Sequence, residues 1–252
     1  MRRPLIGVTG DIEPVAGSAT GAYRVRTGGA YLDAVVKAGG VPVVMHPDVG
    51  LATDYAKRFD GFLLTGGNDP DTTAWGVPMH PKAVAMHAQR QRFEVELLKV
   101  IDATDGGNTP TLGVCMGMQL MGVHRAGIGA LVQHLGDVVP TAGQHGGEGR
   151  DAAHPITATA DWARSELATI TPDASVTSHH HQAVDAAAIS RGNKLRVLAL
   201  CSDGVVEAFD DPERPFYVGV QWHPERTPDR GLGQGVIDRL VEAARRRMPK
   251  AP

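Results

Sequence analysis

The sequence has few cysteines, few aromatic residues and little net charge. Its 252 residues include two cysteines, 5% aromatic side chains and a formal net charge of -3. Two cysteines cannot form a disulfide framework, so we expect a reduced, cytoplasmic protein. A near-neutral charge provides no basic surface for nucleic acid or for an anionic membrane. We therefore expect neither of these partners.

Long apolar runs are also missing. Residues 1–10 contain two arginines but fewer apolar residues than the ~7–15 of a signal-peptide core. No segment approaches the ~20 consecutive apolar residues of a transmembrane helix. A chain of this length can bury one large core or two small ones. We favour one, so that residues 1–252 form a single domain.

Glycine, in contrast, is in surplus. The chain has 31 glycines, whereas an average usage of about 7% would give roughly 18. Disorder would explain a surplus, but hydrophobic residues make up 42% of the chain and the glycines stand among apolar segments. A folded chain with many turns and close backbone approaches fits this composition better.

Short apolar runs alternate with helical patterns in the first half of the chain. The runs are bounded by glycine, proline or asparagine and cover residues 5–9, 41–45, 61–65 and 109–114. Such strands are typical of a parallel sheet buried on both faces. Apolar residues at helical spacing predict helices around residues 31–38 and 84–103. The alternation predicts an α/β fold, a doubly wound and mostly parallel sheet with helices on both faces.

The second half has a different pattern. Residues 140–151 are rich in glycine and polar side chains, which predicts a surface loop. Further strands with little helix between them indicate a small antiparallel extension. They cover residues 156–159, 174–178, 195–201, 205–209 and 216–222. Residues 236–248 predict a final amphipathic helix.

The strongest chemical pattern lies around Cys115. An apolar strand runs into Gly113-Val114-Cys115-Met116-Gly117 and then into a helical segment, which is the arrangement of a nucleophile elbow. The glycines allow a tight turn, and the positive end of a helix dipole favours a thiolate. The alternative is a buried cysteine with incidental glycines, since free cysteine is among the most buried residue types. The spacing and its context favour catalysis.

A thiolate nucleophile needs a base, and His223 is the best placed of eleven histidines. It ends a predicted strand, and Glu225 follows two residues later. At the carboxyl end of a neighbouring strand, His223 would face the crevice in which open α/β sheets bind ligands. Glu225 could then hold the imidazole tautomer, as in a triad. A lone histidine at a strand end is more often structural, and the sequence does not show that it lies near Cys115.

Together these residues resemble the class I glutamine amidotransferase superfamily, and the chain is most similar to its gamma-glutamyl-gamma-aminobutyrate hydrolase-like branch. The resemblance covers nearly the whole chain in order. Besides the elbow and residues 219–225, it includes Arg90 with Phe93-Glu94 and the segments 6–9, 31–32, 38–42, 64–70, 178–182 and 203–208. Each segment alone is weak, but their joint occurrence is specific.

The resemblance implies a flavodoxin-like fold and a role for each matched position. Cys115 would be the nucleophile, His223 the acid and base, and Glu225 the residue that orients the imidazole. The backbone N–H groups of Gly67 and Met116 would form the oxyanion hole. Bare backbone at Gly67 suits that role because it can approach a reacting carbonyl closely.

The resemblance also implies which residues contact the glutamyl part of a substrate. These are Gln119, one helical turn past the nucleophile, and Ser178, His179 and His180. Three positions depart from the branch: Met116 is apolar where a basic residue is frequent, Thr177 replaces asparagine, and Gln91 replaces aspartate. None belongs to the triad, so these departures bear on the identity of the substrate.

Three consecutive histidines, 179 to 181, raise the question of a metal. Adjacent side chains on an extended backbone point in different directions, so they cannot converge on one ion without ligands from elsewhere. The sequence has no HExxH motif and no paired CxxC motif. Its glycine-rich fragments at 127–129 and 231–235 do not complete a dinucleotide-binding GxGxxG motif. We therefore expect neither a metal nor a cofactor.

The expected function is hydrolysis of a small γ-glutamyl amide to glutamate and an amine through a thioester. The amine could be γ-aminobutyrate, a polyamine adduct, another amino compound or ammonia, and the resemblance implies a role in putrescine catabolism. A different possibility is a glutaminase subunit that supplies ammonia to a synthetase. We expect no such obligate partner, although a homo-oligomer is possible. A non-catalytic binding protein on the same fold and a cysteine-type α/β-hydrolase are also compatible with parts of the pattern.

Overall fold

An eight-stranded sheet forms the centre of the molecule. The computed structural model describes residues 2–19, 21–147, 149–191 and 194–248. The strand order is β4-β1-β5-β6-β14-β13-β12-β9. The strands are β1 (Leu5–Val8), β4 (Val41–Val44), β5 (Gly61–Leu64), β6 (Thr111–Val114), β9 (Thr157–Ala158), β12 (Arg196–Leu200), β13 (Val206–Asp210) and β14 (Tyr217–Val220).

The sheet divides into a parallel part and an antiparallel part. Strand β1 pairs in parallel with β4 and β5, β5 pairs with β6, and β6 pairs with β14. Strands β13, β12 and β9 continue the sheet in antiparallel fashion. The predicted α/β fold, a mostly parallel sheet with an antiparallel extension, is confirmed.

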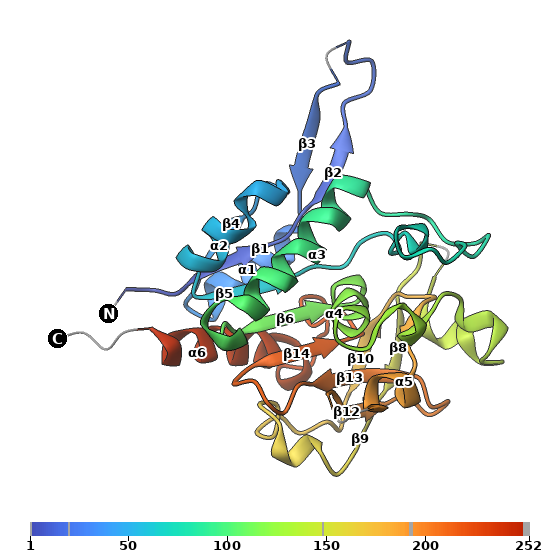
Figure 1. Cartoon of the computed structure of the whole chain (residues 1–252). Helices are drawn as coiled ribbons and strands as arrows, with labels where there is room; N and C mark the ends of the chain where they lie inside the picture. Colours follow the sequence, from blue (N-terminus) through green and yellow to red (C-terminus); the bar gives the residue numbers. More distant parts are fainter. Residues whose placement is uncertain (1, 20, 148, 192–193, 249–252) are drawn as a thin grey trace.

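Helices cover both faces of this sheet (Figure 1). They are α1 (Gly29–Lys37), α2 (Ala52–Arg58), α3 (Ala88–Ala103), α4 (Met116–Ala126), α5 (Ala186–Ser190) and α6 (Val236–Arg247). Alternate residues of β5 point to opposite faces, so Leu63 joins a core with α1 and α6, while Phe62 and Leu64 join a core with α2, α3 and α4.

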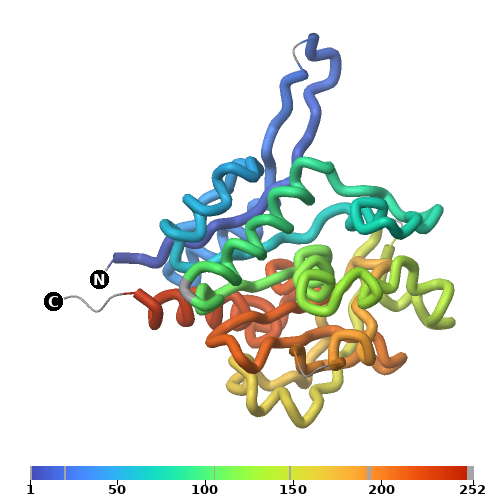
Figure 2. The backbone as a smooth tube through the Cα atoms, in the orientation of Figure 1, coloured from blue at the N-terminus to red at the C-terminus, as the bar shows by residue number. Residues whose placement is uncertain are grey.

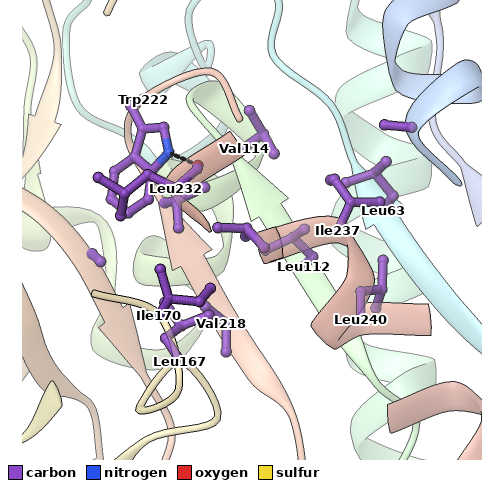
Figure 3. Packing of buried hydrophobic residues seen from close by; sticks show 14 of the residues in the cluster. Leu63, Leu112, Val114, Leu167, Ile170, Val218, Trp222, Leu232, Ile237 and Leu240 are labelled. Atoms are coloured by element: carbon purple, nitrogen blue, oxygen red, sulfur yellow. Dashed lines mark hydrogen bonds between the residues drawn. The ribbon is translucent and has the colours of Figure 1, made fainter. Parts of the chain in front are cut away.

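The core under α6 shows how the strands are buried (Figure 3). Leu112 and Val218 lie with Ile237 in one buried cluster. Trp222, which follows β14, is fully buried and its indole N–H donates to the carbonyl of Leu232 over 2.9 Å. This contact fixes the chain immediately before His223, so the position of the histidine depends on a closely packed core.

A hairpin and two small sheets lie outside the central sheet. The hairpin of β2 (Asp11–Pro14) and β3 (Tyr23–Arg26) stands away from the rest of the chain (Figures 1 and 2). Strand β8 (Ala152–Pro155) pairs with β10 (Ser175–Ser178), and β7 (Leu131–Val132) pairs with β11 (Ala183–Val184). None of the helices in the described residues has the length and apolar character needed to cross a membrane.

Two predicted elements differ in detail from the structure. Helix α3 begins at Ala88 rather than near residue 84, because the side chain of His87 accepts the N–H of Gln89 and caps the helix. Residues 140–151 are not wholly a surface loop. A short 3-10 helix at Ala142–His145 carries His145 into the interior, where it is fully buried.

Candidate active site

Cys115 occupies a strained backbone position between β6 and α4. Its φ of 53° and ψ of -112° make it the only non-glycine residue with positive φ among the described residues. Such a conformation costs about 1–3 kcal/mol and persists only where the surroundings enforce it. Its N–H donates to the carbonyl of Val220 on β14 over 2.9 Å. The structure therefore places Cys115 on a sharp strand-to-helix turn, as the sequence predicted.

The flanking glycines provide room for this turn. A Cβ on Gly117 would overlap the carbonyl group of Leu64, and one on Gly113 would approach the N atom of Met118 to 2.7 Å. Neither glycine has positive φ. Their role is thus to let α4 pack closely on β5 and β6, while Cys115 itself takes the strained conformation.

His223 lies beside the thiol and is held by Glu225. The distance from His223 Nδ1 to Glu225 Oε1 is 2.8 Å. Burial alone would lower the pKa of His223, but hydrogen bonds to Cys115 and Glu225 and the negative charges of both raise this pKa from its usual value to about 9. His223 is therefore protonated at neutral pH and can donate a proton.

Gly66 packs against both Cys115 and His223. A Cβ on Gly66 would lie 3.1 Å from His223 Cε1 and 3.5 Å from Cys115 Cβ. The three groups are thus in contact at the carboxyl ends of β5, β6 and β14. Tyr31 completes the site, because its hydroxyl accepts the N–H of Gly66 over 3.2 Å and lies 3.4 Å from His223 Nδ1. Burial raises the pKa of Tyr31 well above its ordinary value, so the hydroxyl stays neutral.

The loop after β5 rests on a buried arginine. Arg90 Nη2 donates to the carbonyls of Thr65 and Gly66 over 3.0 and 3.1 Å, and Arg90 Nε donates to Glu94 over 2.7 Å. A Cβ on Gly67 would overlap the guanidinium of Arg90. The backbone of Gly67 therefore lies directly on a fixed support.

A cleft of about 880 Å³ opens over Cys115. Its lining includes both residues of the predicted oxyanion hole and three of the four predicted substrate contacts, namely Gly67, Met116, Gln119, His179 and His180. Ser178 is not among the lining residues. It is fully buried, and its hydroxyl donates to the carbonyl of His145 over 3.1 Å. A direct substrate contact through this hydroxyl does not fit the structure.

The positions that depart from the hydrolase branch have structural partners. Gln91 accepts from the N–H of Asp71 and donates to its carbonyl, over 2.7 and 2.9 Å. The carbonyl of Thr177 accepts the N–H of His223 over 2.8 Å. Both residues thus act on the framework of the site, whereas Met116 lines the cleft itself.

Some residues of the site carry no sequence motif. Tyr31 belongs to the predicted helix and to the resemblance, but neither gives its hydroxyl a role, and the hydroxyl can be placed only once α1 is packed beside β5. His181 and Asp69 both line the cleft although they are distant in the sequence, and His181 Nε2 lies 3.0 Å from Asp69 Oδ1. Only the resemblance pointed to Arg90, because a buried arginine cannot be distinguished from an exposed one by its spacing.

A second group of buried polar side chains lies behind the cleft. His145, His154, His180 and Glu207, which we call the Glu207 cluster, have ligand atoms within 4.8 Å of one another. His145 is also grouped with Cys201 and Asp203. Of the three consecutive histidines, only His180 belongs to the Glu207 cluster, and its companions come from distant segments.

Comparisons with known proteins support the fold and the family. Among solved structures, the glutaminase domain of Trypanosoma brucei CTPS matches with a TM-score of 0.61 and 15% identity, over 99% of this chain and 96% of that one. A Thermoplasma acidophilum protein, provisionally named as part of a GMP synthase, gives the same TM-score at 16% identity, over 98% of this chain and 96% of that one. At these identities the similarity shows a shared fold.

Sequence relatives are closer. Rv2859c of Mycobacterium tuberculosis, provisionally named a glutamine amidotransferase, is 32% identical over 99% of this chain and 79% of its own length. Protein NtpR of Enterococcus hirae is 31% identical over 95% of this chain and 98% of its own length. The gamma-glutamyl-gamma-aminobutyrate hydrolase PuuD of Escherichia coli is 26% identical over 89% of this chain and 87% of its own length. The family model for peptidase C26 matches residues 4–225. The chain belongs to the peptidase C26 family, a class I glutamine amidotransferase-like family.

Proposed function

We propose that the protein is a cysteine hydrolase that cleaves the γ-glutamyl amide bond of a small molecule, releasing glutamate and an amine. The observation that carries this proposal is the strained Cys115, which faces a cleft and contacts a histidine held by Glu225. A structural cysteine would gain nothing from such a costly backbone conformation. The named activity of PuuD, a relative over most of the chain, supports the same class of substrate.

The proposed reaction begins with Cys115 Sγ attacking the γ-carbonyl carbon. The C=O electron pair moves to the oxygen, where the N–H groups of Gly67 and Met116 stabilise the charge. The C–N bond then breaks, and His223 donates its proton to the departing nitrogen, which leaves a thioester on Cys115.

The second half of the reaction reverses the direction of proton transfer. Neutral His223 accepts a proton from water, and the water oxygen attacks the thioester carbon. The C–S bond breaks, glutamate leaves, and Cys115 and His223 return to their starting charges. Glu225 keeps the imidazole oriented in both halves through its 2.8 Å hydrogen bond.

The lining of the cleft suits the amino-acid end of a glutamyl group. Lys82 and Arg150 contribute positive charge, Asp69 and Asp151 contribute negative charge, and Gln119 lies one turn beyond Cys115. An α-carboxylate and an α-ammonium group need partners of both signs. Because the cleft is open and its volume is within the range of small-molecule sites, we propose a free γ-glutamyl compound as the substrate.

A screen of γ-glutamyl amides for glutamate release tests this function. The wild type should release glutamate from one or more of them, Cys115→Ala should release none, and His124→Gln should retain full activity. His124 is a suitable control because it pairs with Asp102 at the end of α4 and does not line the cleft. Undiminished release by Cys115→Ala would contradict the proposal.

Covalent labelling distinguishes the remaining functions. A glutamine-like electrophile should label Cys115 but not Cys201, which is buried and absent from the cleft lining. A non-catalytic binding protein would not be labelled. A glutaminase subunit would hydrolyse glutamine, would ignore other γ-glutamyl amides, and would become faster with a co-purified synthetase.

A further inference from the structure

The Glu207 cluster joins four segments that are distant in the sequence. His145 ends the short helix at Ala142–His145, His154 lies on β8, His180 follows β10, and Glu207 lies on β13. Their exposed fractions are 0, 3, 4 and 0%. Four ionisable side chains thus meet where almost none of their surface is exposed to solvent.

The atoms that face the centre of the cluster have no hydrogen-bond partner. They are His145 Nδ1, His154 Nε2, His180 Nε2 and both carboxylate oxygens of Glu207. Buried polar atoms are nearly always paired, and an unpaired one costs about 1–3 kcal/mol, more when charged. Four of these unpaired atoms, the three nitrogens and Glu207 Oε1, lie close together, which indicates a missing common partner.

The outer nitrogens of the three imidazoles show what that partner must be. His154 Nδ1 lies 3.1 Å from the carbonyl of Pro155, and His180 Nδ1 lies 2.9 Å from the carbonyl of Gln182. A carbonyl only accepts, so each Nδ1 carries a hydrogen and the neutral ring turns the lone pair of Nε2 inward. His145 Nε2 lies 3.0 Å from Asp203 Oδ2, which orients its ring in the same way. Metal-binding histidines have outer partners of this kind.

The three separations from Glu207 to the histidines match the edges of a tetrahedral site. Glu207 Oε1 lies 3.3 Å from His145 Nδ1 and 3.6 Å from both His154 Nε2 and His180 Nε2. With zinc–ligand bonds of about 2.0–2.1 Å, neighbouring ligand atoms of a tetrahedral site are separated by about 3.3–3.4 Å. The three separations from Glu207 Oε1 are close to these edges and too long for strong hydrogen bonds, and the inner nitrogens lie within 4.8 Å of one another.

An ion pair without metal explains the cluster less well. A proton on His145 could satisfy that residue and one oxygen of Glu207. The inward lone pairs of His154 and His180 would still face a carboxylate with no donor between them, which is electrostatically unfavourable in a buried site. A cation satisfies all four groups together.

We propose that His145, His154, His180 and Glu207 bind a divalent transition-metal ion, for which Zn²⁺ is the best match, in a closed structural site. Three imidazoles and one carboxylate form a ligand set that suits zinc. Four protein ligands leave no open position for water or substrate, so the ion does not take part in the hydrolysis. The proposal opposes the sequence-based expectation that the chain binds no metal.

The proposed ion would hold one wall of the cleft. His180 lines the cleft, as do Gly146 and Ala152, which neighbour the ligands His145 and His154. The carbonyl of His179 lies 3.8 Å from Cys115 Sγ. A cross-link between the four segments would therefore fix the wall that faces the nucleophile.

Metal binding by the full-length chain tests this site. Protein stripped with a chelator and titrated with Zn²⁺ should bind one tightly held equivalent, with a rise in the melting temperature. Co²⁺ should give the visible absorption of a tetrahedral complex. Glu207→Gln should lose the tight equivalent, and Asp203→Asn should weaken its binding about 10–100-fold, because Asp203 only orients a ligand.

A histidine outside the cluster provides the matched control. His134 stacks on His80 and lies near His181, so this half-buried group beside the cleft would be the place for adventitious zinc. His134→Gln should therefore keep the tight equivalent. The proposal is wrong if the stripped wild type gains no thermal stability from Zn²⁺, or if His134→Gln rather than Glu207→Gln removes the bound metal. The wild-type titration decides the question even if Glu207→Gln does not fold.

Discussion

The proposed catalytic site around Cys115 and the Glu207 cluster both bring histidine and carboxylate together in buried surroundings, but they leave different atoms unpaired. At the catalytic site, His223 has Glu225 on one side and Cys115 on the other, and the pKa of the imidazole is raised to about 9. In the Glu207 cluster, three imidazoles turn unpaired nitrogens toward one carboxylate. A mobile proton satisfies the first arrangement, whereas the second needs a cation. In this protein, one histidine beside a carboxylate accompanies the proposed proton transfer, and three histidines around a carboxylate accompany the proposed metal.

The largest expected effect comes from substitutions that affect one of the two sites and leave the other intact. His223→Ala should lower kcat about 10²–10⁴-fold, because it removes the proposed acid and base, and should leave metal content unchanged. Glu207→Gln should remove the metal and lower activity less, because it only loosens a wall of the cleft. Metal analysis and glutamate release on the same preparations check both statements. Loss of metal from His223→Ala would mean that the two sites are not independent.

The next effect concerns Arg90, which supports the loop after β5 and its proposed oxyanion-hole residue Gly67. Arg90→Met should lower kcat about 10²-fold with little change in KM, because the carbonyls of Thr65 and Gly66 lose their hydrogen bonds to the guanidinium and the Gly67 N–H moves away from the reacting carbonyl. The neighbouring and exposed Arg92 offers the control Arg92→Met, which should behave as wild type. An Arg90→Met variant that melts as wild type and keeps its kcat would remove Arg90 from the mechanism.

The sequence predicted these two sites unequally, for a physical reason. Cys115 lies between two glycines at the end of an apolar strand, and His223 ends another, so local patterns and the resemblance indicated both. That β6 and β14 are adjacent could not be derived from the spacing. The Glu207 cluster has no local pattern, since its ligands come from four segments and His145 lies within a predicted surface loop. Its existence depends entirely on tertiary packing.

The fold also has parts that the sequence predicted and parts that it did not. The buried strands were predicted because their apolar residues must face helices on both sides. The hairpin of β2 and β3 was missed because it buries little: Tyr23, Arg24 and Arg26 are exposed. Its strands are four residues long, so the alternation of Tyr23 and Val25 with two arginines is too short on its own to predict a strand.

The pH dependence of hydrolysis should report the charge on His223. The acid must be protonated, so kcat/KM should fall as the pH rises through about 9. The stabilisation of the fold by this raised pKa is complete below the ordinary value of 6.5 and disappears as the pH rises toward 9. Glu225→Gln removes a negative charge that raises the pKa, so its alkaline limb should lie at lower pH. An unchanged limb would show that another group controls the profile.

The smallest expected effect comes from Tyr31, which contacts the catalytic site but does not transfer a proton. Tyr31→Phe removes the hydroxyl that accepts the N–H of Gly66 and leaves the ring in the core. A lost hydrogen bond of about 1 kcal/mol corresponds to roughly a five-fold fall in kcat/KM. Tyr55→Phe is the control, since its hydroxyl bonds to His46, whose contacts lie outside the cleft. Because Tyr31 also lies beside His223 Nδ1, the variant should shift the alkaline limb slightly, which a purely structural role would not do. A fall in kcat/KM of more than 10²-fold would instead indicate that Tyr31 takes part in proton transfer. His223 and Glu225 would then not be the only groups that supply the proton.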